Sequence, residues 1–447
     1  MKASLALLAL LLGMAIPAPA NVQYAVTEIR VGDFAFTSPN SINASGQVVG
    51  SAHNFYAYAN AKFRWPAFPV TSFLFANGAT TILPGLGGSA VTANAINDSG
   101  SIVGSSSLTD RTGPRPLSTT FKPAAIHAFL NVGGAVSDLG TLGGATSQAA
   151  GINAAGLIVG SSAIAGDKHT HAFLVSGGSM IDLGTLGGHD SAASAINTSG
   201  QIVGSAALAG DKHTHAFLVS GGSMVDLGTL GGRDSAANAI NAAGQIVGSA
   251  SIAHDKVTRA FLYAGGVMTN LGPAGSDYSV ATAISDSGKI VGTFTSPRNR
   301  GARAFLSSSG TFLDLNSLIS RTSGWELNAA TAVNNAGLIA GTGTLNQRPC
   351  AFLLTPIDGT TPAPTLAIAG GKTFTSNGPR LAIRGTTAGA ALSVTYRVGT
   401  KGPFLRAHGV SRWQFNARLM PGKNHITVVA HGIGGDSGPA RITVIRR

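Results

Sequence analysis

The chain of 447 residues has little of several things that commonly stabilise a protein. Its one cysteine, Cys350, excludes an intramolecular disulfide. Only 11% of its residues are charged, and no segment shows a helical hydrophobic period over ten or more residues. Apolar runs outside the N-terminus are too short to span a bilayer. Stability must therefore come from the packing of non-helical structure.

Acidic residues are also scarce, with 18 Asp and Glu against 30 Lys and Arg and a formal net charge of +12. The basic residues are scattered without a run of four, so the stripe typical of nucleic-acid-binding proteins is missing. We expect no nucleic-acid partner. G-x-S-x-G, Walker and zinc-peptidase motifs are absent too. The sequence predicts no catalytic residue, no metal site and no cofactor.

The N-terminus has the pattern of a secretory signal over residues 1–20. Lys2 precedes an apolar run, Leu5 to Ile16, and Ala18-Pro19-Ala20 matches a cleavage site. The mature chain is expected to start at Asn21, outside the cell or in the periplasm. No cysteine lies near this site, which excludes a lipoprotein anchor.

Gly is abundant, with 61 residues, and much of it lies in a repeat. A turn motif, I-N-x-x-G-x-[IV]-[VA]-G-[ST] with small changes, starts at Ile42, Ile96, Ile152, Ile196, Ile240, Ile284 and Val333. An [A/S]-F-L element also occurs seven times, whereas a third element, D-L-G or a relative, follows it only six times. The middle copies repeat every 44 residues, from Asn153 to Asn197 to Asn241. Such a period indicates units that pack against their own copies.

Each repeat is expected to form four short antiparallel strands. In the copy that spans Ser191 to Gly231 these are Ala193–Ile196, Gln201–Leu208, His215–Ser220 and Met224–Gly228, with Thr229 to Ser235 crossing to the next copy. The sequence therefore predicts an all-β fold whose residues 21–355 form a seven-bladed β-propeller. Tyr24 to Gly32 would supply the strand that the last repeat lacks and close the ring. An open β-solenoid is the structural alternative.

Composition changes at a Pro/Thr-rich linker, residues 356–364, and residues 365–447 have a different strand spacing. We expect a small immunoglobulin-like β-sandwich there, with a hairpin at Pro421-Gly422.

The repeats resemble the HAF-repeat family of bacterial extracellular proteins over about residues 22–355. His171-Ala-Phe173, His215-Ala-Phe217 and the D-L-G-T-L-G-G runs from Asp182 and Asp226 carry this resemblance. It implies an exported repeat protein and no common activity. The tail resembles a bacterial immunoglobulin-like module through Tyr396-Arg-Val-Gly399, Trp413 and Pro421-Gly-Lys-Asn424.

Histidines and aspartates recur in the repeats. His169-Thr-His171 and His213-Thr-His215 have a metal-ligand spacing, but the equivalents of His171 in the other copies are Ser72, His127, Arg259, Arg303 and Cys350. We therefore expect a polar cap at a strand end. The D-L-G aspartates lie on the outermost strand and are expected to be solvated or to bond neighbouring backbone. Cys350 is expected to pack.

One end of the ring is the candidate binding surface. The loops between second and third strands and the crossovers open on this end, and charged and histidine residues concentrate there. An aromatic insert in the first repeat, Ala52 to Val70, also lies at this end. The candidate ligand-binding residues are Tyr56, Tyr58, Trp65, His189, Asp190, Arg233, Asp234 and Tyr278. Polar groups beside flat aromatics suit a glycan or a peptide, although loops are also polar because they are solvated.

Three functions remain open. The favoured one is a secreted, non-catalytic binding or adhesion protein that recognises glycan or peptide. The alternatives are an enzyme acting on polysaccharide at the propeller mouth and a structural component of the envelope or a biofilm.

Overall fold

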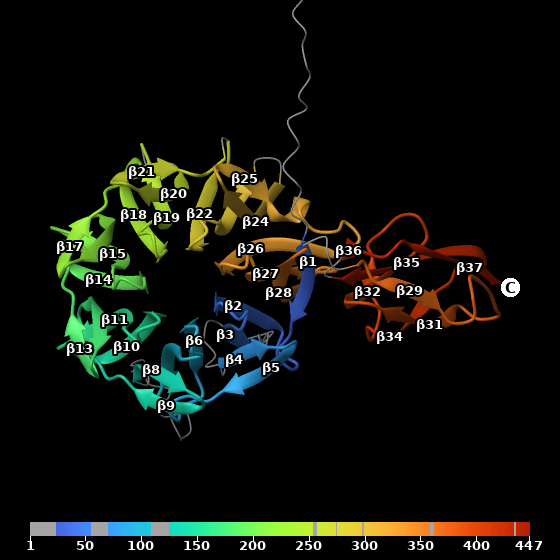
Figure 1. The fold of residues 1–447 in the computed structure, drawn as a ribbon, viewed down its shortest axis with the longest axis horizontal. Helices are drawn as coiled ribbons and strands as arrows, with labels where there is room; N and C mark the ends of the chain where they lie inside the picture. The colour runs from blue at the N-terminus through green and yellow to red at the C-terminus, as the bar shows by residue number, and fades with distance from the viewer. Residues whose placement is uncertain are drawn as a thin grey trace, which may run out of the picture.

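The computed structural model describes residues 24–54, 70–108, 125–253, 257–273, 275–296, 299–357, 362–432 and 435–447. These residues are all-β, with strands β1 to β37 and one 3-10 turn, η1 (Leu315–Ser317). Within these ranges, no helix is long and apolar enough to cross a membrane. Figure 1 shows a ring of short sheets with a smaller body beside it.

The ring (Figure 1) contains three four-stranded sheets and two eight-stranded sheets. Each eight-stranded sheet is two antiparallel groups of four strands joined by one parallel pair, β8 with β10 or β20 with β22. We call each group of four strands a unit. In each unit the first strand lies next to the ring axis and the fourth lies at the outside. The first three units contain β2 (Phe36–Ile42), β3 (Val48–His53), β4 (Thr71–Ala76), β5 (Ala79–Leu83), β6 (Val91–Ile96), β7 (Ile102–Ser107), β8 (Ile126–Val132), β9 (Ala135–Asp138), β10 (Gly143–Ile152), β11 (Ile158–Ile164), β12 (Thr170–Ser176) and β13 (Ser179–Asp182).

The next three units repeat this order. They contain β14 (Gly187–Ile196), β15 (Ile202–Leu208), β16 (Thr214–Ser220), β17 (Ser223–Asp226), β18 (Gly231–Ile240), β19 (Ile246–Ile252), β20 (Thr258–Ala264), β21 (Val267–Asn270), β22 (Tyr278–Ile284), β23 (Ile290–Ser296), β24 (Asn299–Ser308) and β25 (Thr311–Asp314).

The seventh unit is built from both ends of the ring segment. It contains β26 (Trp325–Val333), β27 (Ile339–Leu345), β28 (Arg348–Pro356) and, as its outer strand, β1 (Tyr24–Ile29). β1 pairs antiparallel with β28 from Tyr24 opposite Pro356 to Ile29 opposite Ala351. This is the strand that the count of D-L-G elements predicts to be missing from the last repeat.

The A-F-L phenylalanines form the centre of each unit, and all seven have no exposed surface. Opposite each of these phenylalanines lies a glycine of the second strand, as Gly204 lies opposite Phe217. The first strand bulges beside this glycine, between Ala193 and Ala195. A Cβ on Gly204 would overlap the carbonyl oxygen of Ala192. The I-V-G sequence is thus explained by a close backbone approach that only glycine permits.

The turn asparagines join neighbouring units. Asn197 accepts hydrogen bonds from the backbone N–H groups of Ser199 and Gln201, which fixes its own turn. Its Nδ2 also donates to the carbonyl oxygen of Asn241 in the next unit, at 3.1 Å. The same inter-unit bond is donated by Asn43, Asn97, Asn153, Asn241 and Asn334. The bond from Asn334 reaches Asn43, so the last unit is tied to the first.

Residues after the ring form two packed sheets. One sheet has the order β29 (Thr365–Ile368), β31 (Arg380–Ala388), β34 (Arg412–Arg418). The other contains β30 (Thr373–Ser376), β37 (Ala440–Arg446), β35 (Gly422–Gly432), β32 (Ala391–Val398), β33 (Leu405–Arg406) and β36 (Gly435–Asp436). Trp413, Phe415 and Val428 are buried between the sheets.

The predicted hairpin at Pro421-Gly422 was wrong. The strand before it, β34, pairs with β31 and, at Gln414, with His408, whereas β35 pairs with β32, β36 and β37. The turn therefore carries the chain from one sheet to the other. Trp413, Phe415 and Ala417 face the core on β34 with Ile426 and Val428 on β35, and this burial determines the crossing.

Candidate functional site

The first strands extend further than the sequence suggests. The segment Thr229 to Ser235 was predicted to be a crossover, and this was wrong, because β18 already begins at Gly231. His189 and Asp190 likewise lie within β14, and Arg233 and Asp234 within β18. These residues therefore stand on strands at the loop end of the ring. They lie in irregular stretches of those strands, between paired residues Gly187 and Ser191 in β14 and between Gly231 and Ser235 in β18.

The structure brings four of the polar residues at this end together. The imidazoles of His169 and His189 stack with their centroids 4.5 Å apart and an angle of 19° between their planes. Asp211 accepts hydrogen bonds from the backbone N–H and from Nδ1 of His189. Asp190 accepts from the backbone N–H of Thr170 at 2.7 Å and lies 3.7 Å from Nδ1 of His169. We call His169, His189, Asp190 and Asp211 the histidine cluster.

The carboxylates of this cluster hold the loops in place. The pKa of Asp211 is held below its usual value, mainly by the hydrogen bond from the backbone N–H of His189 and next by the one from its imidazole. Asp190 links the first strand of the fourth unit to the start of β12 in the third. Both carboxylates already accept protein hydrogen bonds, although Asp190 is 58% exposed. Of the imidazoles, His189 is 63% and His169 is 37% exposed, so His189 and Asp190 are the most exposed side chains of the cluster.

The next pair of units repeats part of this arrangement. Asp234 accepts from the backbone N–H of Thr214 at 3.0 Å and lies 3.8 Å from Nδ1 of His213. Arg233 takes the place of His189, so no second imidazole stacks there, and its carbonyl oxygen lies 3.2 Å from Nε2 of His215. The stacked pair thus occurs between the third and fourth units but not between the fourth and fifth.

The remaining candidates do not join the cluster. Tyr278 begins β22 in the sixth unit and is 43% exposed. Tyr56, Tyr58 and Trp65 lie outside the described residues.

The D-L-G aspartates pair with side chains that the sequence interpretation left unconnected. His127, His171 and His215 each place Nδ1 within 2.8–2.9 Å of Asp138, Asp182 and Asp226 of the adjacent outer strand. Each aspartate also accepts from the N–H of the following glycine, as expected for backbone bonding. In the seventh unit Glu28 holds the aspartate position, opposite Phe352. In the sequence, the similarity of Glu28-Ile29 to the Asp-Leu of the D-L-G elements indicates that Glu28 holds this position.

The two histidines of the first H-x-H pair face different partners. His169 faces Asp190 of the next unit, whereas His171 faces Asp182 of its own unit. Across the described part of the chain, no three His, Cys, Asp or Glu residues gather as metal ligands would. Cys350 is buried as predicted, and burial raises the pKa of its thiol to about 11.

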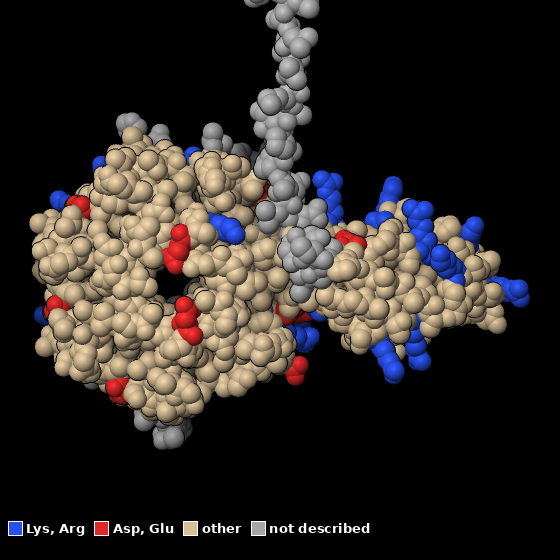
Figure 2. Space-filling view, viewed as in Figure 1, with Lys and Arg blue, Asp and Glu red and all other residues tan. Residues whose placement is uncertain are grey.

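A cavity of about 230 Å³ lies on the ring axis, where Figure 2 shows an opening with acidic side chains at its rim. The turn residues of all seven units line it, among them Asp98 and Asp286. These two carboxylates accept the backbone N–H groups of Ala44 and Ala242. The polar groups around the opening are thus used to hold units together.

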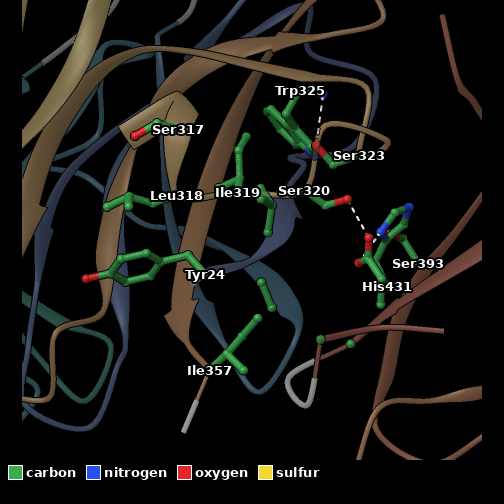
Figure 3. A pocket seen from close by; sticks show the side chains of 15 residues that line it. Tyr24, Ser317, Leu318, Ile319, Ser320, Ser323, Trp325, Ile357, Ser393 and His431 are labelled. Carbon is green, nitrogen blue, oxygen red and sulfur yellow. Dashed lines mark hydrogen bonds and ion pairs between the residues drawn. The ribbon is translucent and has the colours of Figure 1, made fainter. Parts of the chain in front are cut away.

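A second cavity, of about 240 Å³, lies where the ring meets the C-terminal domain (Figure 3). Asp436 accepts hydrogen bonds from Ser320 and Thr322 of the ring, and His431 Nδ1 lies 2.7 Å from it. His431 Nε2 lies 2.8 Å from the hydroxyl of Thr395. A hydroxyl, an imidazole and a carboxylate in sequence are the groups of a nucleophilic triad.

The burial of Thr395 argues against catalysis at this junction. Thr395 is 1% exposed, and its hydroxyl also lies 3.2 Å from the carbonyl oxygen of Thr322. A substrate could not reach this oxygen, so the network serves to fasten the two bodies. Glu28 adds a second fastening, because it binds Arg348 of the ring at 2.5 Å and Arg406 of the C-terminal domain.

Comparisons with known proteins give weak similarities. No family model and no curated protein sequence matches the chain. Among solved structures, a Trypanosoma rangeli sialidase in complex with the inhibitor DANA is 10% identical, with 91% of this chain and 86% of that chain covered and a TM-score of 0.32. The extracellular domain of a hybrid two-component system from B. thetaiotaomicron is 9% identical, with 93% and 73% covered and a TM-score of 0.23. Fibronectin(III)-like modules of Clostridium thermocellum CbhA are 17% identical, with 19% and 96% covered and a TM-score of 0.16. These similarities are too weak to transfer an activity.

Proposed function

We propose that this is an exported, non-catalytic binding protein that recognises a glycan at the loop end of its ring. Export is supported by the sequence pattern of residues 1–20. The ring is proposed to be a seven-bladed β-propeller closed by β1, and the C-terminal domain to be immunoglobulin-like. Seven units of the same strand order and an asparagine bond from the last unit to the first support the propeller.

The histidine cluster is the observation that carries this proposal. Two stacked imidazoles, one from β14 (His189) and one from the residue before β12 (His169), present flat faces and ring nitrogens at the surface. Sugar hydroxyls both donate and accept hydrogen bonds, and neutral imidazole has one donor and one acceptor nitrogen. The carboxylates beside the rings are preorganised by the backbone N–H groups that they accept. A rigid polar platform limits the ordering that binding must impose.

Binding of the mature chain to a glycan and peptide array tests the proposal. His169→Ala with His189→Ala should lower the affinity for the glycans that bind by about tenfold, because two direct hydrogen-bonding groups are lost. His408→Ala, an exposed histidine of the C-terminal domain, is the matched control and should leave affinity unchanged. A folded protein that binds no glycan, or one that binds equally well without the cluster, contradicts the proposal. Binding to peptides alone assigns the other ligand class, and turnover of a bound glycan supports the enzyme alternative.

A further inference from the structure

The positive charge of this protein belongs almost entirely to the C-terminal domain. Residues 365–447 contain 12 of the 30 Lys and Arg residues but only one of the 18 Asp and Glu residues, so they carry +11 of the net charge of +12. Figure 2 shows Lys and Arg side chains projecting from this domain, whereas acidic and basic side chains are mixed on the ring. The rest of the chain, residues 1–364, is therefore nearly neutral.

Four of these arginines share one sheet face. On β34, alternate residues Trp413, Phe415 and Ala417 are buried, which turns Arg412 and Arg418 outward. On β31, burial of Ile383 and Gly385 turns Arg380 and Arg384 outward in the same way. The exposed positions around them are Thr365, Ala367, Ala382, Thr386, Ala388, Gln414 and Asn416. We call this surface the arginine face.

The register places like charges next to each other. Arg380 lies directly opposite Arg418, Arg384 opposite Gln414, and Arg412 opposite Thr386. Directly opposite residues have Cβ atoms about 5 Å apart, and like charges in such a pair destabilise a sheet. A sandwich that needed only solubility could carry an acidic residue at one of these positions. The arrangement therefore suggests a ligand that supplies the missing negative charge.

These guanidinium groups are also unoccupied. Among the described residues, none of the four guanidinium groups has a hydrogen bond or an ion pair, whereas Arg303 and Arg348 of the ring and Arg406 of the C-terminal domain are paired with carboxylates. Guanidinium binds carboxylate through two parallel hydrogen bonds, which makes it well suited to a repeated planar anion.

We propose that the arginine face binds an acidic polysaccharide through its carboxylates. From Arg412 to Arg418 the face extends about 20 Å, the length of several sugar residues. The short side chains of Ala367 and Ala382 leave the face flat between the arginines, so an extended chain can lie across the strands. Thr386, Gln414 and Asn416 supply hydrogen-bonding groups for hydroxyls between the charges. The proposal deepens the glycan-binding function by adding a second site, and it rests on the chain meeting polysaccharide outside the cell.

Other polyanions fit this face less well. Single-stranded nucleic acid is bound by stacking its bases on aromatic side chains, and the exposed described residues of the face include no aromatic one. A lipid surface is bound by apolar side chains together with basic ones, and the residues between the arginines are polar or alanine. A carboxylated polysaccharide needs only charge and hydrogen bonds.

Binding of the full mature chain to polygalacturonate tests the proposal. The variant with Arg380, Arg384, Arg412 and Arg418 all changed to Gln should bind at least about tenfold more weakly, and its affinity should depend less on salt. The variant with only Arg380 and Arg418 changed should show an intermediate loss, and it keeps the test valid if the fourfold variant misfolds. The matched control for the Arg380/Arg418 variant is Lys423→Gln with Arg441→Gln, which removes two exposed charges from the other sheet. The affinity of this control should be nearly unchanged.

Three further probes separate the possible outcomes. Neutral dextran should not bind through this face. An oligothymidylate or phosphatidylglycerol vesicles that bind more tightly than polygalacturonate, and lose binding in the Arg380/Arg418 variant, would overturn the assignment to polysaccharide. Equal loss in the face variant and its control would overturn the site. The His169/His189 variant should keep its affinity for polygalacturonate, so failure of the loop-end proposal is seen separately.

Discussion

In the ring, each histidine of the A-F-L elements has an aspartate beside it, and the loop carboxylates accept backbone N–H groups. In the C-terminal domain, four arginines of one sheet have no partner among the described residues. The two regions thus use charge differently. Polar side chains in the ring mainly hold repeated units together, whereas the four arginines of this sheet are left available. Stability should therefore respond to changes in the ring, and binding of anions to changes in the domain.

Removing β1 should have the largest effect. Deletion of residues 21–33 leaves β28 with an open edge and removes Tyr24, Val26 and Ile29 from the core. Each large apolar side chain contributes about 1.5–3 kcal/mol on burial, so the ring should lose at least about 5 kcal/mol. Thermal melting of the mature chain with and without this segment measures the loss. Unchanged melting would show that β1 does not complete the ring.

A methyl group at Gly204 should have the next largest effect. Gly204→Ala forces a Cβ into the backbone of the bulged strand and should cost about 3 kcal/mol. Gly378→Ala in the C-terminal domain is the matched control, because the nearest atom would be 4.0 Å away. Denaturant unfolding compares the two variants. Equal stabilities would contradict the close approach that explains the I-V-G sequence.

Loss of Glu28 should separate the two regions. Glu28→Gln leaves Arg348 and Arg406 without their shared carboxylate, which is 11% exposed. The cost should be about 1–2 kcal/mol, because water screens the partly exposed arginines. Calorimetry should then show the ring and the domain melting in separate transitions. Asp33→Asn, which breaks an exposed pair with Arg30, should leave the melting profile unaltered.

The smallest effect is expected from pH. Burial alone raises the pKa of Asp436, but hydrogen bonds from His431, Ser320 and Thr322 outweigh burial and hold it below its usual value. A lowered carboxyl pKa stabilises the folded state above the unfolded value of about 3.9, and this stabilisation is lost as pH falls through the folded pKa. Melting temperature should therefore fall more steeply below about pH 4 in the natural chain than in Asp436→Asn. Parallel curves would count against this role.

The sequence predicts much of the ring because the ring is made of local signals. Repeated turn motifs, and the absence of a D-L-G element after the seventh A-F-L element, are enough to predict the four-strand units and the position of β1. The start of β14 at Gly187 was missed, because Gly and His have low strand propensity and only pairing with β15 extends the strand. Pairing between Asp190 and the Thr170 backbone joins different units, and no spacing within one repeat reveals it.

The histidine cluster shows the same limit. His189 and Asp190 were selected from their position at one end of the ring, but the stacking of His189 on His169 depends on how the third and fourth units approach each other. The arginine face was within reach of the sequence. Arg412-Trp-Gln-Phe-Asn-Ala-Arg418 alternates outward polar and inward apolar residues, and a charge count limited to residues 365–447 shows the excess.

The position of β1 also sets an order of events during synthesis. β1 leaves the ribosome before every other strand, but its partner β28 ends at Pro356. The first strand to be synthesised is therefore the last to pair. It stays unpaired while the chain of the first six units and of β26 to β28 is made. A chaperone that shields Tyr24 to Ile29 during this interval would protect the exposed strand from pairing with another copy.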